Sequence, residues 1–183
     1  MAINITAPFD KDSIKDLKTG DSVLISGTIY TARDAAHARM VEEYNAGKGF
    51  PIDLKNQVIY YAGPCPAKPG DVIGSCGPTT AGRMDKFAPL LLDEGLAAMI
   101  GKGSRSESVK DAVVRNGAIY FGAIGGAGAL IAQCITSAEV VAYDDLGTEA
   151  IRKLTVKDFP AVVLMDCKGN DLYVTGQKEY RQI

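Results

Sequence analysis

Histidine and tryptophan are nearly absent from this chain of 183 residues, and cysteine never occurs as a close pair. The sequence has one histidine, no tryptophan, and four widely separated cysteines, namely Cys65, Cys76, Cys134 and Cys167. Zinc sites combine closely spaced cysteine and histidine, and iron–sulfur clusters usually take a close group of cysteines. We therefore expect no metal ligands in this chain.

Charge of one sign is not concentrated in the sequence either. The formal net charge is −2, and lysine and arginine are spread along the chain without a basic block. Nucleic acid and anionic membrane surfaces are therefore poor candidate partners. The N-terminal residues, MAINITAPFDKD, lack the basic and apolar parts of a signal peptide, and unpaired cysteines suit a reducing compartment. We expect a cytoplasmic protein whose residues 1–183 form a single domain.

One long uncharged stretch, residues 116–138, meets the length criterion for a membrane-spanning helix. It is interrupted by several glycines and ends in polar residues. The segment AIYFGAI is typical of a strand and GALIAQCI of a buried helix, with a glycine turn between them. The sequence favours this strand, turn and helix over a membrane span.

Short β-branched segments alternate with helical patterns along the rest of the chain. We expect strands at residues 22–32, 57–62, 71–74, 96–100, 139–143, 161–165 and 172–175, the last closing a hairpin turn at 168–171. We expect helices at residues 33–44, 81–94, 106–115 and 148–154, with a bend or break at Pro89. Strands this short and this often interrupted predict an α/β fold with a mixed sheet or small barrel and flanking helices.

The stretch GSCGPTTAGRMD, residues 74–85, carries the most distinctive chemistry. It offers two adjacent hydroxyls at Thr79 and Thr80, followed by a helical pattern that contains Arg83. Amide donors at a helix start and a guanidinium favour the binding of an anion such as a carboxylate. The alternative is a threonine that caps a helix beside a surface arginine.

Similar chemistry recurs at two other junctions. Arg33 lies near one expected helix start and Lys102 near another, within Gly101-Lys102-Gly103-Ser104. If the three junctions converge, Arg33, Arg83 and Lys102 would line one pocket suited to a dicarboxylate. Residues 95–102 fail the spacing of a nucleotide phosphate loop, and residues 126–131 lack the third glycine of a dinucleotide fingerprint.

Ordinary acid–base and nucleophilic groups are few. His37 is a possible base, but its helix is rich in polar residues and a structural role is the alternative. Cys65 lies before the threonine stretch, residues 74–85, and Cys76 lies within it, and without a nearby histidine they are read as packing side chains. A threonine hydroxyl acts as a base only beside positive charge that stabilises its deprotonated form.

Three segments of the chain resemble one enzyme family. TARDAAHARM at residues 31–40, YYAGPCPAKPGDVIGSCGPTTAGRMD at 60–85 and GKGSR at 101–105 resemble the β subunit, or C-terminal domain, of class I fumarate hydratases and related L-tartrate dehydratases. The resemblance covers nearly the whole chain, and GPTT-x-x-RMD is its most specific motif. It implies a swivelling β/β/α fold and a hydro-lyase of the tricarboxylic acid cycle that interconverts fumarate and L-malate.

The resemblance also implies a division of labour between two chains. Thr79 would abstract the proton and Lys102 would add positive charge, while Arg33, Arg83 and Thr80 would bind the substrate. A [4Fe-4S] cluster and the complementary acid would come from an α subunit, so that this chain alone would be inactive. An assembly of α2β2 type is what the family implies.

Two alternatives remain open at the level of sequence. The substrate of such a hydro-lyase could be L-tartrate, which would give oxaloacetate, or mesaconate in place of fumarate. A protein of another class, a non-catalytic domain that binds small anions, is favoured by the lack of metal ligands and of an ordinary general base.

Overall fold

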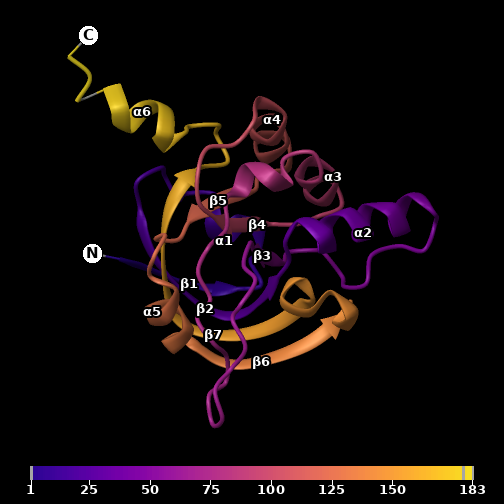
Figure 1. Ribbon diagram of the computed structural model, residues 1–183. Helices are drawn as coiled ribbons and strands as arrows, with labels where there is room; N and C mark the ends of the chain where they lie inside the picture. Colours follow the sequence, from indigo (N-terminus) through magenta and orange to yellow (C-terminus); the bar gives the residue numbers. More distant parts are fainter. Residues whose placement is uncertain (1, 179, 183) are drawn as a thin grey trace.

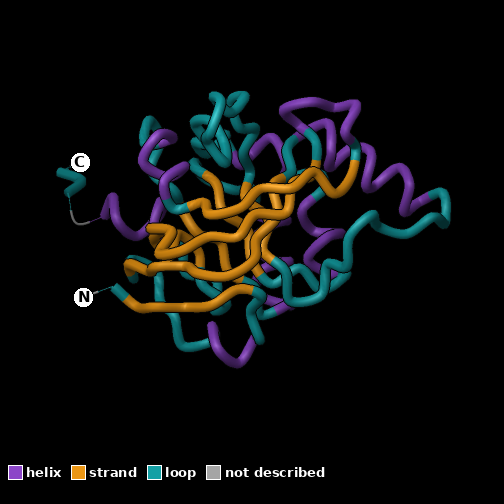
Figure 2. Tube along the Cα trace, turned by 90° about the horizontal axis from the view of Figure 1, so that it is seen from below, coloured by secondary structure: helices purple, strands orange, loops and turns teal. Residues whose placement is uncertain are grey.

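The computed structural model describes residues 2–178 and 180–182, and its centre is a seven-stranded mixed sheet (Figures 1 and 2). The strands follow the order β1-β2-β3-β4-β5-β7-β6, and an additional pairing joins β2 to β7. Their bounds are β1 Ile3–Ala7, β2 Ser22–Thr31, β3 Val58–Tyr60, β4 Ala98–Gly101, β5 Ile119–Gly122, β6 Ile135–Ala142 and β7 Ile151–Met165.

The additional pairing closes the sheet into a barrel. Strands β2, β3, β4 and β5 are parallel neighbours, whereas β7 runs antiparallel to both β5 and β2. Strand β1 pairs with β2, and β6 pairs with β7. The predicted α/β fold, with a mixed, short-stranded barrel and flanking helices, is confirmed.

The short parallel strands separate two cores by the alternation of their side chains. In β4, Ala98 and Ile100 join the barrel interior, whereas Met99 joins a second core outside it. Strand β5 repeats the pattern, since Phe121 faces inward and Tyr120 outward. Successive strand residues point to opposite faces, so every residue of these strands is apolar and nearly all are buried.

Helices cover the outer core. Helices α2, α3 and α4 lie together on one side of the sheet (Figure 1). They supply buried apolar side chains to the outer core, among them Met40, Leu92 and Val113. The helices are α1 Lys11–Ile14, α2 Asp34–Asn45, α3 Ala88–Asp93, α4 Glu107–Asn116, α5 Gly128–Gln133 and α6 Leu172–Lys178, with 3₁₀ segments η1 Ala81–Met84 and η2 Asp144–Glu149. Helix α4 ends at Gly117, whose left-handed backbone (φ 63°) forms the cap that Asn116-Gly117 predicts.

Two expectations around the threonine stretch were wrong. Residues 71–74 are not a strand; they belong to a long excursion between β3 and η1 that projects beyond β6 (Figure 1). The helix expected at 81–94 is divided into η1 and α3, and Pro89 lies in the first turn of α3. Proline suits that position because the first amides of a helix have no partner within the helix.

Two further errors lie in the C-terminal third. Residues 148–154 are not a helix: η2 ends at Glu149 and β7 begins at Ile151. The strand expected at 172–175 is part of helix α6. The turn at residues 168–171, which precedes α6, is held by the buried carboxylate of Asp166. This carboxylate accepts hydrogen bonds from the Lys168 amide and from both the amide and the side chain of Asn170.

The uncharged stretch at residues 116–138 contains β5, a glycine-rich turn and α5, as expected, but α5 is not a buried helix: only Gly128 and Ile131 are buried in it, and β6 begins at Ile135. Among the residues that the structure describes, no helix is both long enough and apolar enough to span a bilayer.

Candidate functional site

The predicted site residues gather at the carboxyl ends of the parallel strands. Arg33 follows β2, Gly63 follows β3, and Lys102 follows β4 directly. Parallel strands end at the same edge of a sheet, so these separate segments meet at one edge of the barrel. Loops beyond strand ends commonly form the ligand sites of α/β proteins.

Backbone contacts hold the threonine stretch against this edge. The Thr79 amide donates to the Tyr61 carbonyl over 2.7 Å, and a parallel β-bridge joins Thr80 to Lys102. The Ala81 amide donates to the Lys102 carbonyl over 2.8 Å. These bonds place Thr79, Thr80 and Lys102 in one group. Because η1 is a single turn and its first amide, that of Ala81, is already bonded, the start of η1 is not by itself an anion site.

The two threonine hydroxyls are available for other contacts. Thr80 stands at the N-cap of η1, but its side chain makes no capping hydrogen bond. Within the described part of the chain, the hydroxyls of Thr79 and Thr80 are not donors or acceptors in any side-chain hydrogen bond. Thr79 is half-buried and Thr80 is exposed. The simple capping role considered from the sequence therefore does not apply to Thr80.

The two arginines meet through a carboxylate. Oδ2 of Asp34 lies 2.8 Å from Nη2 of Arg83 and 3.6 Å from Nη2 of Arg33. A second carboxylate, Glu149, lies 3.5 Å from Arg33 and accepts a hydrogen bond from the Ala35 amide at the start of α2. Arg33 is 22% exposed and Arg83 is 53% exposed, so Arg83 is the more accessible. Two acidic side chains thus balance the two arginines.

Glycine allows the arginine group and the threonine group to approach each other. A Cβ atom on Gly63 would lie 2.8 Å from Nη1 of Arg33, so this arginine packs directly on the backbone after β3. One residue earlier, Ala62 forms an antiparallel bridge with Pro78, which precedes Thr79. Arg33 and Thr79 are therefore linked through a short stretch of backbone.

The glycine-rich turn after β5 borders Lys102. A Cβ atom on Gly125 would lie 3.6 Å from Nζ of Lys102, and one on Gly128 would lie 2.9 Å from the Gly77 amide nitrogen. In the described residues, Lys102 takes part in no ion pair and its side chain is exposed. Ile124 and Leu130, which are 69% and 66% exposed, flank these glycines. Free positive charge and exposed apolar surface thus lie side by side.

His37 lies behind the site. It is fully buried, and its Nδ1 lies 2.9 Å from the Arg33 carbonyl oxygen. Because a carbonyl only accepts, Nδ1 carries the proton and Nε2 is a bare acceptor. Burial lowers the pKa of His37 to about 4, so the ring is neutral near pH 7. A neutral, enclosed ring that bonds the Arg33 backbone fits the structural role better than a solvent-facing base.

The cysteines near the stretch have different environments. Cys65 is exposed, whereas Cys76 is buried and burial raises the pKa of its thiol to about 12. The Cys76 thiol therefore stays protonated and is a weak nucleophile. In residues 2–178 and 180–182, no group of histidine, cysteine and acidic side chains is arranged to hold a metal ion.

Sequence reasoning missed the carboxylates and one arginine at this edge. Asp34 and Glu149 pair with the predicted arginines, and Asp85 pairs with a fully buried Arg105. Asp34, Asp85 and Arg105 lie inside the recognised segments, and that position was the available signal. Glu149 had no such signal, because its partner lies more than a hundred positions away in the chain.

Fold and edge together define an α/β barrel domain with a cationic, solvent-open rim at the carboxyl ends of its parallel strands. A family model described as Fumarase C-terminus matches residues 1–176. The chain belongs to this family, as its resemblance in sequence predicts.

Several named proteins are similar to the chain. The anaerobic class I fumarate hydratase of Escherichia coli (strain K12) is 49% identical over 151 residues, which cover 81% of this chain and 28% of that protein. Fumarate hydratase 2 of Leishmania major is 40% identical, covering 93% of this chain and 31% of that protein. A putative L(+)-tartrate dehydratase subunit beta of Methanocaldococcus jannaschii is 37% identical, covering 89% and 87%.

The fraction of each relative's length that this chain covers differs between the fumarate hydratases and the tartrate dehydratase subunit. The chain spans less than a third of either fumarate hydratase, but it matches most of the tartrate dehydratase subunit. The region found here thus occurs both as part of a long chain and as a protein that is named a subunit.

Proposed function

We propose that residues 1–183 form one β-type domain of a cytoplasmic, [4Fe-4S]-dependent hydro-lyase that hydrates fumarate reversibly to L-malate. The observation that carries the proposal is that Arg33, Arg83 and Lys102 lie at one strand edge with Thr79 and Thr80, whose hydroxyls make no side-chain hydrogen bond within the described residues. The similarity to fumarate hydratases supports the choice of substrate.

In this proposal the arginines bind one carboxylate of the substrate. Arg33 and Arg83 present guanidinium groups, which suit a carboxylate through paired hydrogen bonds. In the structure, the Asp34 carboxylate pairs with both arginines, 3.6 Å from Nη2 of Arg33 and 2.8 Å from Nη2 of Arg83. A substrate carboxylate would share the arginines with Asp34 or displace it. Arg83, the more exposed of the two arginines, is the side chain that would turn toward the substrate. Thr80 adds a hydroxyl to the same wall.

Thr79 takes the proton from the carbon next to that carboxylate, and it returns the proton in the hydration direction. Its hydroxyl must first release its own proton to water at the open rim, which leaves an alkoxide and requires stabilising positive charge. Lys102 is the candidate for this charge, since its backbone is bridged to that of Thr80 and its side chain takes part in no ion pair in the described residues. The same cation stabilises the negative charge that develops on the substrate when the proton leaves.

The cluster and the second half of the site belong to another chain or domain in this proposal. The described residues do not fit an iron–sulfur cluster, because they include no suitable group of ligands and the buried Cys76 thiol stays protonated. We assign the cluster, and the acid that acts at the hydroxyl-bearing carbon, to an α subunit. The open rim and the exposed Ile124 and Leu130 favour closure by a partner, as in an α2β2 assembly.

Reconstitution tests the proposal. Mixing the chain with its α partner under anaerobic conditions should restore fumarate hydration, and neither chain should be active alone. Thr79→Val should reduce kcat by about a thousandfold or more, whereas Thr79→Ser, which keeps a hydroxyl, should retain measurable turnover. Arg83→Ala should mainly raise KM. Full activity in the Thr79→Val and Arg83→Ala complexes would refute the assignment.

L-Tartrate dehydratase is the second candidate, because the subunit named for that activity matches this chain over most of its own length. A competition assay of the assembled complex with fumarate, L-tartrate and mesaconate would separate the substrates by their kcat/KM values. Calorimetric binding of phosphate in preference to every diacid, without turnover, would instead support a non-catalytic anion-binding domain.

A further inference from the structure

A buried ion pair lies beneath the threonine stretch. The Arg105 side chain is 0% exposed, and its Nε donates to Oδ1 of Asp85 over 2.7 Å. Oδ2 of the same carboxylate accepts from the Ser106 amide over 2.6 Å. Both oxygens of Asp85 are therefore engaged by one segment, residues 105–106.

This pair joins two segments that carry proposed site residues. Asp85 is the C-cap of η1, which contains Arg83 and follows Thr79 and Thr80. Arg105 lies three positions after Lys102, in the loop between β4 and α4. On the rim, the same two segments are held by the bridge between Thr80 and Lys102. The ion pair is thus a second connection, placed on the buried side.

Two tyrosines enclose the guanidinium of Arg105. Its carbon Cζ lies 5.3 Å from the ring centre of Tyr61 and 4.9 Å from that of Tyr120. The backbone carbonyl of Tyr61 also accepts a hydrogen bond from the Thr79 amide, and the Tyr120 hydroxyl donates to the Gly103 carbonyl over 2.9 Å. Each tyrosine that stacks on Arg105 therefore also bonds a rim segment, Tyr61 through its backbone at Thr79 and Tyr120 through its hydroxyl beside Lys102.

The charge of Arg105 persists in this setting. Burial alone would lower its pKa, but the neighbouring Tyr61 and Asp85 raise it above the ordinary arginine value. The flat guanidinium also stacks between rings and directs Nε to a carboxylate, which a lysine ammonium does not reproduce. Charge and shape are both used.

We propose that Arg105 and Asp85 are positioning residues that fix Lys102 and the Thr79–Arg83 segment relative to each other. This inference rests on the proposed function for its catalytic consequence, but its structural consequence is separate. Loss of the pair should loosen the two rim segments while the barrel stays folded. A displacement of about 1 Å between catalytic groups is enough to slow an enzyme by orders of magnitude.

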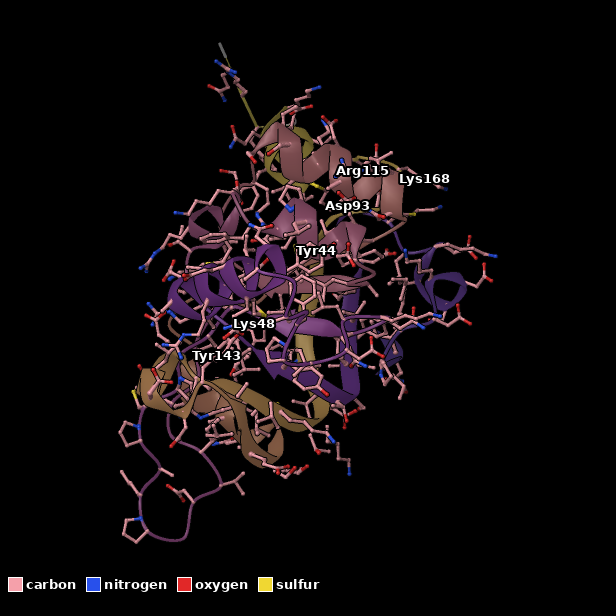
Figure 3. All side chains as sticks on the ribbon, turned by 90° about the vertical axis from the view of Figure 1, so that its right-hand side faces the viewer. Tyr44, Lys48, Asp93, Arg115, Tyr143 and Lys168 are labelled. Atoms are coloured by element: carbon pink, nitrogen blue, oxygen red, sulfur yellow. The ribbon has the colours of Figure 1, made fainter. Side chains whose placement is uncertain are left out.

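The test compares two arginine–aspartate pairs. Arg105→Lys alters the buried pair, and Arg115→Lys alters an exposed one, in which Nε and Nη2 of Arg115 donate to Asp93 over 2.8 and 2.7 Å. Figure 3 shows the Arg115 and Asp93 side chains together, and they connect α4 to α3. Both substitutions keep the charge and remove the planar fork.

Amide hydrogen exchange on the full chain gives the structural result without any activity. Arg105→Lys should speed exchange at residues 79–83 and 101–104 by about tenfold or more, and β2 and β5 should stay within about twofold of wild type. Arg115→Lys should leave the rim segments unchanged. Unchanged exchange at the rim in Arg105→Lys, or an equal rise throughout the chain, would overturn the proposal.

Turnover of the assembled complex gives the catalytic result. Arg105→Lys should lower kcat by about tenfold or more with a smaller change in KM, and Arg115→Lys should leave both unchanged. If the wild-type complex has no hydratase activity, the proposed function fails while the exchange result still decides the positioning role. Asp85→Asn is the second variant if Arg105→Lys does not fold, and failure of both to fold would show that the pair serves the whole fold and overturn the proposal.

Discussion

At the scale of single residues, His37 shows how burial fixes a protonation state. Its ring lies 5.3 Å from the ring centre of Tyr61, and within the described residues its Nε2 has no hydrogen-bond partner. A proton added to Nε2 would place a charge in an enclosed space that also lies near the Arg105 cation. The folded protein therefore resists protonation of His37 until the pH is well below the ordinary range for histidine.

This resistance predicts a pH-dependent stability. The pKa of His37 is about 4 in the folded state and 6.5 when unperturbed, so between these values the unfolded state binds a proton that the folded state does not. The free energy of unfolding should therefore fall as pH drops through this window, by about 3 kcal/mol in all. Urea unfolding at several pH values would measure this decline.

His37→Leu is the comparison for that measurement. The variant has no histidine, so the share of the decline that arises from His37 should disappear, whatever the variant's stability at neutral pH. The carboxylates titrate in both proteins and cancel in the difference. Parallel curves of unfolding free energy against pH for the two proteins would contradict the prediction.

Residue types were easier to foresee than their pairings. The recurrence of a cation at three expected strand-to-helix junctions predicted that Arg33, Arg83 and Lys102 would share an edge, and the structure brings them to one, although no strand precedes Arg83 at residues 71–74. The sequence did not indicate that Asp34 would pair with Arg83, because that contact depends on the angle between α2 and η1. Glu149 lies 114 positions after Ala35 in the chain, so no local sequence pattern could indicate the hydrogen bond between them.

At the scale of elements, local patterns predicted what local interactions decide. Helix α4 and its glycine cap were foreseen, because amphipathic spacing and a left-handed terminus are properties of one segment. Strand β7 was only partly foreseen, since charged residues interrupt its pattern and Pro160 lies inside it. Its full length depends on pairing with β2, β5 and β6, which are distant in sequence.

The contact between α5 and the threonine stretch gives a prediction for one element. A Cβ atom on Gly128 would lie 2.5 Å from the Ser75 hydroxyl oxygen and 2.9 Å from the Gly77 amide nitrogen. Gly128→Ala should therefore force the loop and helix apart and destabilise the protein by about 1–3 kcal/mol. Chemical unfolding would measure the loss.

Gly125→Ala is the matched control, because it adds the same methyl group three positions earlier. Its nearest neighbour would be Cδ of Lys102 at 3.5 Å, an ordinary contact with a flexible side chain. Stability should change by no more than about 0.5 kcal/mol. Equal losses from the two alanine substitutions would show that close packing at Gly128 is not the cause.

At the scale of the whole molecule, closure of the barrel explains why the site is built from separate segments. The short parallel strands bring several separate segments of the chain to one edge of the barrel, and each segment contributes one or two side chains to the candidate site. The same edge is shallow and open, with Thr80, Arg83 and Lys102 all exposed. A reaction that requires exclusion of water would need a cover that residues 2–178 and 180–182 do not supply.

The exposed Ile124 and Leu130 indicate where that cover would rest. Both border the glycine turn beside Lys102, and two large exposed apolar side chains close together in the chain favour this turn as a surface that meets another protein. Ile124→Glu combined with Leu130→Glu should weaken assembly with the proposed α partner by about a hundredfold or more, because burial of two carboxylates at an apolar contact is costly. Sedimentation of mixed chains would measure the assembly.

Ile3→Glu is the control for surface charge, because Ile3 is 42% exposed on β1 and pairs with Val23 at the start of β2, the end of the parallel strands opposite the rim. It should assemble normally if the partner covers the rim. The double variant should also keep the melting temperature of the isolated chain, since its two side chains already face solvent. Normal assembly by the double variant would place the partner elsewhere and leave the rim open, which would remove the main structural reason for a shared active site.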